Sequence, residues 1–91
     1  RAILLKETGA VRKMAVIFGG AGAVALASSS QALSPRVEYA QNIGIELSAC
    51  GFALSKSYLT SEDLPANMHI VTYGILETIK LVNTGYAVMQ Y

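Results

Sequence analysis

The sequence predicts an all-α membrane protein, with one transmembrane helix followed by a helical hairpin. The first observation is an uncharged run from Met14 to Pro35, between Arg12-Lys13 and Arg36. A helix of about 20 residues spans the ~30 Å apolar core of a bilayer. The second is composition: 53% of the residues are hydrophobic and 14% are charged, against roughly 25% charged in typical soluble domains. The third is helical spacing of apolar residues beyond Pro35.

Residues 1–13 form a cationic lead in this prediction, with Arg1, Lys6, Arg12 and Lys13 against Glu7. Apolar residues in the lead, Ile3-Leu4-Leu5 and Val11, favour an amphipathic turn on a membrane surface. Residues 14–34 are the predicted transmembrane helix. Basic residues before a span favour the side from which it is inserted, so the N-terminus is expected on the stromal or matrix side.

Residues 35–91 are predicted to form the hairpin, with helices at about 35–58 and 66–90. Ser34-Pro35 supplies an N-cap followed by a proline at the first helical position. Pro65 ends the polar connector from Thr60 and can start the next helix. Charged residues inside both helices leave their spanning of the membrane open.

Two stripes at helical spacing are expected to pack the hairpin together. The first runs through Val37, Ala40, Gly44, Leu47, Gly51, Leu54 and Tyr58. Gly44 and Gly51 on it permit close approach of another helix, as small residues do in membrane bundles. The second stripe includes Ile75 and Ile79. These four residues, Gly44, Gly51, Ile75 and Ile79, are the predicted helix-packing positions.

Five polar side chains are candidate pigment ligands: His69, Gln41, Asn42, Glu46 and Asn83. Histidine can bind chlorophyll magnesium axially, and the other four offer the hard oxygen ligands that magnesium prefers. The ordinary interpretation of His69 is an interfacial polar residue near a helix end. Chlorophyll and carotenoid are the possible cofactors in this prediction, and no other cofactor is expected.

No catalytic or metal-binding constellation is visible in the sequence. His69 is the only histidine and has no second ligand at zinc spacing, nor a serine and acid that the sequence can group with it. Cys50 is the only cysteine. It is expected to be a small buried apolar residue, because free cysteine packs as one. The sequence therefore predicts a protein that is not an enzyme.

Residues 12–32 resemble an export signal of the thylakoid-transfer or bacterial secretory type. Arg12-Lys13 is a cationic start, Met14 to Ala27 an apolar centre, and Ser30-Gln31-Ala32 a small-residue cleavage site. The predicted function is that of a small accessory subunit that stabilises a large organellar energy-converting complex, with a peripheral photosystem subunit in the thylakoid membrane favoured. Its expected partners are larger membrane subunits and lipids, without nucleic acid or a small-molecule substrate.

Three alternatives stay open. The first is an accessory subunit of a respiratory or ATP synthase complex in the mitochondrial inner membrane. The second is a membrane-tethered hairpin that acts as a binding module or assembly factor. The third is a fragment of a dinucleotide-binding enzyme, because the apolar stretch 15–18 reads as a strand and Gly20 to Ala25 matches GxGxxA.

Overall fold

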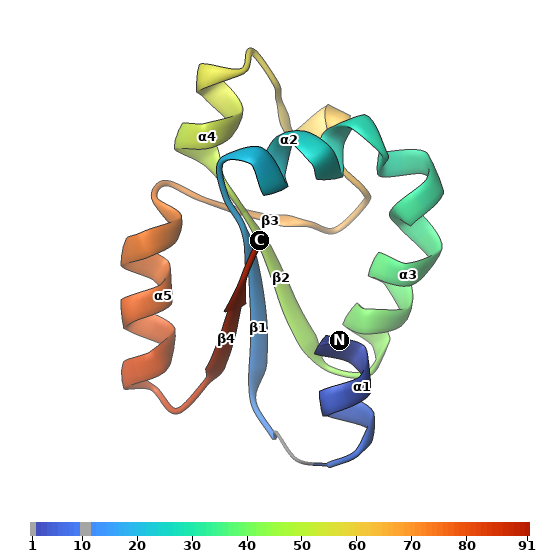
Figure 1. Cartoon of the computed structure of the whole chain (residues 1–91), viewed down its shortest axis with the longest axis vertical. Helices are drawn as coiled ribbons and strands as arrows, with labels where there is room; N and C mark the ends of the chain where they lie inside the picture. Colours follow the sequence, from blue (N-terminus) through green and yellow to red (C-terminus); the bar gives the residue numbers. More distant parts are fainter. Residues whose placement is uncertain (1, 10–11) are drawn as a thin grey trace.

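The chain folds into a four-stranded parallel β-sheet with helices on both faces (Figure 1). The structure is a computed structural model that describes residues 2–9 and 12–91. The part of the predicted cationic lead that falls on Arg1 and Val11 lies outside these residues. The described part of the lead contains one short helix, α1 (Ala2–Glu7).

The strands lie in the order β3-β2-β1-β4, so β1 and β2 are central and β3 and β4 are the edges. Helical segments connect each strand to the next. The strands are β1 (Met14–Phe18), β2 (Ile45–Cys50), β3 (His69–Val71) and β4 (Ala87–Gln90). The helices after α1 are α2 (Ala21–Ser28), α3 (Ser30–Asn42), α4 (Gly51–Lys56), a short 3-10 helix (Ser61–Asp63) and α5 (Gly74–Asn83).

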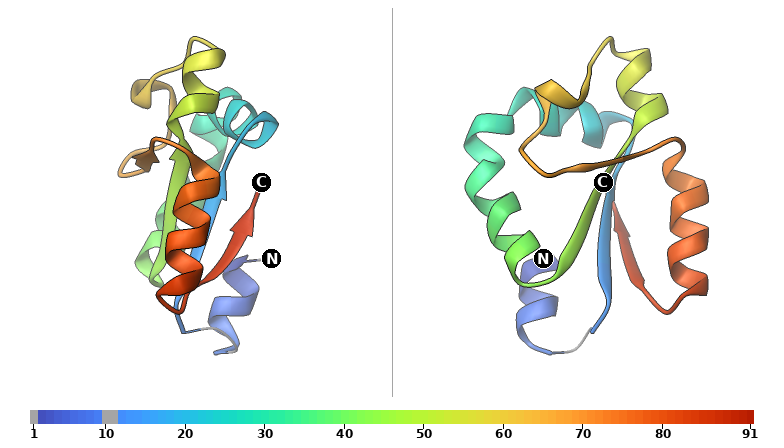
Figure 2. Two further views of the ribbon diagram at one scale, coloured as in Figure 1. Left: turned by 90° about the vertical axis from the view of Figure 1, so that its left-hand side faces the viewer. Right: turned by 180° about the vertical axis from the view of Figure 1, so that it is seen from behind.

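The hydrophobic core is divided by the sheet. Met14 and Val16 of β1 pack with α1, α2, α3 and α4 on one face, whereas Ala15 and Ile17 pack with Leu81 of α5 on the other. In Figure 1, α5 lies to the left of the strands and α1 and α3 to the right, and Figure 2 shows the same separation from behind. Among the described residues, α5 is therefore the helix that covers this face of the sheet.

Glycine ends the two longest helices and turns the chain back into the sheet. Gly44 follows α3 with φ +91°, and Gly85 follows α5 with φ +92°. The Gly85 N–H donates to the Val82 carbonyl and the Tyr86 N–H to the Leu81 carbonyl, which satisfies carbonyls at the helix end. These turns place the starts of β2 and β4 beside Met14 of β1.

The prediction of an all-α membrane protein is wrong. Residues 14–34, the expected transmembrane helix, form β1, a glycine turn, α2 and the beginning of α3. β1 is apolar throughout because a central parallel strand is buried on both faces, and residues 14–17 are all at most 3% exposed. Gly20 then has φ +55°, a conformation that a continuous helix does not contain.

The prediction of two hairpin helices is also wrong. The range 35–58 holds the end of α3, β2 and α4, and the range 66–90 holds β3, α5 and β4. Val37, Leu47 and Leu54 of the first stripe are all buried, but they belong to α3, β2 and α4 respectively. Within residues 2–9 and 12–91, the structure contains no helix with the length and apolar character needed to cross a membrane.

Candidate functional site at the carboxyl edge of the sheet

An apolar cavity of about 470 Å³ opens where β1 and β2 end. In open parallel α/β sheets, ligands bind outside the carboxyl ends of the strands. Here the ends of β1 and β2, the start of α5 and the end of β4 meet around one space. The cavity is lined by Ile17, Gly19, Cys50, Phe52, Tyr73, Gly74, Ile75, Gln90 and Tyr91.

Cys50 is the nucleophilic side chain of this cavity. It is the last residue of β2 and the N-cap of α4, and it is half-buried. The backbone N–H of Gly74, the first residue of α5, donates a hydrogen bond to Cys50 Sγ over 3.4 Å. The sulfur therefore faces both the cavity and the N-terminus of a ten-residue helix.

Glycine at position 74 permits this approach of helix to sulfur. A Cβ atom on Gly74 would lie 3.0 Å from Ile17 Cγ2 and 3.5 Å from Cys50 Cβ. The first contact is tighter than ordinary van der Waals packing, so a side chain here pushes α5 away from β1 and β2. Close backbone approach of this kind is a use to which glycine is suited.

The electrostatic surroundings of Cys50 come from the backbone. The first N–H groups of a helix have no intrahelical partner and carry partial positive charge, which favours an anion beside them. Aromatic side chains line part of the cavity, and the ring centroids of Phe52 and Tyr73 are 5.6 Å apart. Among the described residues that line the cavity, the ionisable side chains are Cys50, Tyr73 and Tyr91. The site offers a thiol and helix dipoles without a histidine or carboxylate as general base.

The glycine-rich turn after β1 packs against the chain itself. The Gly19 N–H donates to the Tyr91 carbonyl over 2.6 Å, and a Cβ atom on Gly22 would lie 2.2 Å from backbone atoms of Tyr91. The strand, turn and helix required by the dinucleotide alternative are therefore present, but Tyr91 occupies the space beside the glycines where a pyrophosphate would have to approach.

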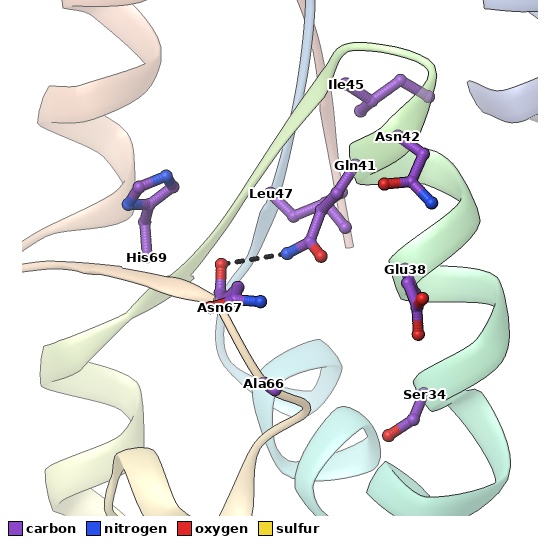
Figure 3. Close-up of a pocket in the computed structure, with 9 residues that line it drawn as sticks. All are labelled: Ser34, Glu38, Gln41, Asn42, Ile45, Leu47, Ala66, Asn67 and His69. Atoms are coloured by element: carbon purple, nitrogen blue, oxygen red, sulfur yellow. Dashed lines mark hydrogen bonds between the residues drawn. The ribbon is translucent and has the colours of Figure 1, made fainter.

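A second, polar groove brings three of the predicted pigment ligands together (Figure 3). It has a volume of about 580 Å³ and lies between α3 and the segment before β3. Gln41 and Asn42 project from α3, and His69 begins β3. The other lining residues are Ser34, Glu38, Ile45, Leu47, Ala66 and Asn67. The sequence could not predict that Gln41, Asn42 and His69 lie together, because their proximity depends on how β3 pairs with β2.

Part of this groove is held together by its own hydrogen bonds. Gln41 Nε2 donates to the Asn67 carbonyl over 2.9 Å, which ties α3 to the segment before β3. Figure 3 shows the ring of His69 directed away from Glu38 and Ser34. In the part of the chain that the structure describes, no three His, Cys, Asp or Glu side chains are grouped to hold a metal ion. The groove thus has a clear structural role, and binding of a pigment there stays a prediction.

The two remaining pigment candidates lie elsewhere. Asn83 is the last residue of α5 and is exposed. Glu46, on β2, accepts a hydrogen bond from the Tyr86 hydroxyl over 3.2 Å. This hydrogen bond, together with the charge of the Glu46 carboxylate, raises the pKa of Tyr86 above its usual value.

The Tyr86–Glu46 bond predicts a loss of stability in alkaline solution. A raised pKa means that the folded state holds the phenol proton more tightly than the unfolded chain does. The contribution is complete below about pH 10, the pKa of unfolded tyrosine, and disappears as pH rises through the folded-state pKa. We expect Tyr86→Phe to reduce this alkaline loss, measured by urea unfolding at neutral and alkaline pH. Tyr58→Phe, at a side chain 95% exposed, is the control, and equal losses in all three proteins would contradict the assignment.

The four predicted helix-packing residues are dispersed. Gly44 terminates α3. Gly51 begins α4, and a Cβ atom there would lie 3.1 Å from the Val71 carbonyl oxygen, so it permits close approach of a strand end rather than a helix. Ile75 and Ile79 lie on the outer side of α5, where they are 68% and 54% exposed.

Fold and site together define a parallel α/β protein with a single thiol at the carboxyl edge of its sheet. No family model and no curated protein matches the chain. Among solved structures, it is similar to a protein of unknown function, MTH1491 from Methanobacterium thermoautotrophicum. The likeness covers 88% of this chain and 100% of that chain at a TM-score of 0.60 and 14% identity, which shows a shared fold.

This fold corrects the predicted function and location. The prediction of a photosystem subunit in a thylakoid membrane is wrong, and so is the alternative in a mitochondrial membrane. The parallel α/β architecture, its similarity to MTH1491 and the lack of a membrane-spanning helix among the described residues overturn both. The predictions on cofactors, partners and lack of enzymatic activity remain untested.

Cys50 was not predicted from the sequence to be a functional residue. The signal that could have found it is its place after Ile45 to Ala49, where apolar residues alternate with Glu46 and Ser48 as in a strand, and before Gly51. A thiol at the end of a strand and next to a helix start faces the edge where parallel sheets bind ligands. That signal depends on recognising the stretch as a strand.

Proposed function

We propose that the protein is a sulfur carrier, in which Cys50 accepts a sulfur atom from a persulfide donor and passes it to an acceptor thiol. The observation that carries the proposal is the Gly74 N–H directed at Cys50 Sγ within the apolar cavity. Backbone donors at a helix N-terminus stabilise negative charge on sulfur, and the thiolate is the nucleophilic form of cysteine.

The transfer balances without a further reactant. The Cys50 thiolate attacks the outer sulfur of a persulfide, R–S–SH. The S–S bond of the donor breaks, the donor leaves as the thiolate R–S⁻, and Cys50 becomes Cys–S–SH. An acceptor thiolate then attacks that outer sulfur in the same manner and releases the Cys50 thiolate.

The lone cysteine favours transfer between molecules. Cys50 has no second cysteine in the chain with which to close a disulfide, so a sulfur bound to it must leave to another molecule. The aromatic and aliphatic walls suit a polarisable sulfur atom. A hydrolytic role finds less support, because the described lining lacks the general base that activates water.

Intact-protein mass spectrometry tests the proposal. The reduced protein is incubated with glutathione persulfide, desalted and weighed, and an acceptor thiol, 2-mercaptoethanol, is then added. We expect the mass to increase by one sulfur atom and to return on addition of the acceptor. Cys50→Ser is the matched control, because it retains the shape of the site and lacks the nucleophile.

Two outcomes would contradict a sulfur carrier. One is the absence of a one-sulfur adduct on the wild-type protein. The other is an equal adduct on Cys50→Ser. Modification of Cys50 by an acyl thioester but not by the persulfide would move the function to acyl transfer.

A further inference from the structure

A second apolar cavity reaches into the hydrophobic core on the face of the sheet that carries α1 and α3. It has a volume of about 310 Å³ and lies between β1, β2 and the helices α1, α2 and α3. Val16 lines this cavity, whereas Ile17 lines the cavity of Cys50 on the other face of the sheet. The inner wall consists of core side chains that are at most 9% exposed: Ala2, Val16, Leu26, Val37, Ala40 and Leu47.

This space is suited to an apolar occupant. Protein interiors are packed about as densely as organic crystals, with few voids larger than a water molecule. A buried water molecule needs about two to four polar partners, and apolar cavities without them stay dry. The inner wall offers only hydrocarbon side chains. An apolar ligand therefore gains contacts with this wall that water does not make.

The opening of the cavity carries a cationic side chain. Arg36 is exposed, and together with Ile3 it lines both the cavity and a shallow hollow beside it. The cavity therefore opens to solvent between α1 and α3. Of the described side chains that line the cavity, Arg36 is the one that is charged at neutral pH. Tyr39, in the hollow, donates a hydrogen bond from its hydroxyl to the Glu7 carboxylate, which ties α1 to α3.

We propose that this cavity binds a medium-chain aliphatic carboxylate. The hydrocarbon chain lies among the core side chains, and the carboxylate pairs with the Arg36 guanidinium. The planar fork of N–H groups on a guanidinium matches the two oxygens of a carboxylate. An apolar cavity of about 150 Å³ holds one benzene ring. The volume of about 310 Å³ here is about twice as large, which fits a chain of about eight carbons.

This ligand site is separate from the proposed sulfur transfer. Cys50 does not line the cavity, and Tyr91 is a residue that both cavities share. A carboxylate bound beside Arg36 leaves the thiol free to react on the opposite face of the sheet. Either proposal can therefore fail without the other.

Titration calorimetry of the full chain with sodium octanoate tests the proposal. We expect saturable binding, and at least about tenfold weaker binding of butyrate, which buries fewer methylene groups. Arg36→Gln should weaken octanoate binding about tenfold, because it removes the cation, and should leave the binding of 1-octanol unchanged. Lys80→Gln removes a charge from an exposed position on α5, on the other face of the sheet. This control should bind octanoate as the wild type does.

Nuclear magnetic resonance locates the bound chain. We expect nuclear Overhauser effects between octanoate and the methyl groups of Val16, Leu26 and Leu47, which line the inner wall. No saturable binding of octanoate, contacts with other methyl groups only, or equal affinities of the wild type and Arg36→Gln would each overturn the proposal. Tighter binding of 1-octanol than of octanoate would also overturn it, because the preferred occupant would then be uncharged.

Discussion

Gly22→Val is expected to lower the free energy of unfolding by about 3 kcal/mol, combining overpacking with the loss of hydrogen bonds. A Cβ atom at position 22 would lie 2.2 Å from the carbonyl carbon and oxygen of Tyr91. Those atoms cannot rotate away as the end of a side chain can. The end of β4 must move, which breaks the Gly19–Tyr91 and Tyr91–Ile17 backbone hydrogen bonds of 2.6 and 2.9 Å.

Urea unfolding followed by circular dichroism measures this loss. The matched control is Gly19→Ala, because a Cβ atom on Gly19 would meet only Cys50 Cβ, at an ordinary van der Waals distance of 3.8 Å. We expect this change to cost less than about 1 kcal/mol, since it neither overpacks the turn nor strains the backbone. A Gly22→Val protein as stable as Gly19→Ala would mean that the end of the chain does not pack against the glycine turn.

Gly74→Pro is expected to slow the reaction of Cys50 with iodoacetamide about tenfold relative to Gly74→Ala. Both variants place a Cβ atom 3.0 Å from Ile17 Cγ2, so the steric effect at Ile17 is shared. Only proline removes the N–H that donates to Cys50 Sγ, and its ring Cδ takes the place of that hydrogen, so the sulfur must also shift away from the start of α5. A hydrogen bond to a charged group contributes about 1.5–3 kcal/mol, and each 1.4 kcal/mol is a factor of ten.

The backbone at this position accepts proline. Position 74 is the first residue of α5, where proline is well tolerated. Tyr73 has φ −133° and ψ 120°, the extended conformation that a residue before proline prefers. Equal alkylation rates in the two variants, with equal circular dichroism spectra, would show that the Gly74 N–H does not activate the thiol.

Part of the fold could be read locally from the sequence. The interpretation of residues 15–18 as a strand followed by a glycine turn and a helix agrees with β1, Gly19-Gly20 and α2. The preferred interpretation failed because β1 is buried on both faces and α2 is rich in alanine. Together they imitate one long apolar helix when length and charge are the criteria.

The prediction of a helical hairpin at residues 35–91 failed for a different reason. Val37 and Ala40 lie on one helical face, but Leu47 and Leu54 continue the same spacing in a strand and in another helix. The periodicity therefore crossed three elements by coincidence. Gly44, taken as a helix-packing residue, was in fact the stop signal, since glycine commonly follows the last turn of a helix.

The candidate site could not be assembled from the sequence. Cys50, Gly74 and Tyr91 meet only because β1 and β2 pair in parallel and α5 returns across their ends. Without the strands, Cys50 was a lone thiol with nothing to distinguish it from a packing residue. The polar groove likewise depends on a contact between Gln41 and Asn67, which lie far apart in the chain.

The most direct test of the central claim compares the alkylation rate of Cys50 in the native protein with that in urea-unfolded protein. Glutathione under the same two conditions corrects for the effect of urea on the reagent. If the fold activates Cys50, the native protein reacts at least about tenfold faster than the unfolded chain. A native rate equal to or below the unfolded rate would make Cys50 a packing residue and contradict the proposed carrier.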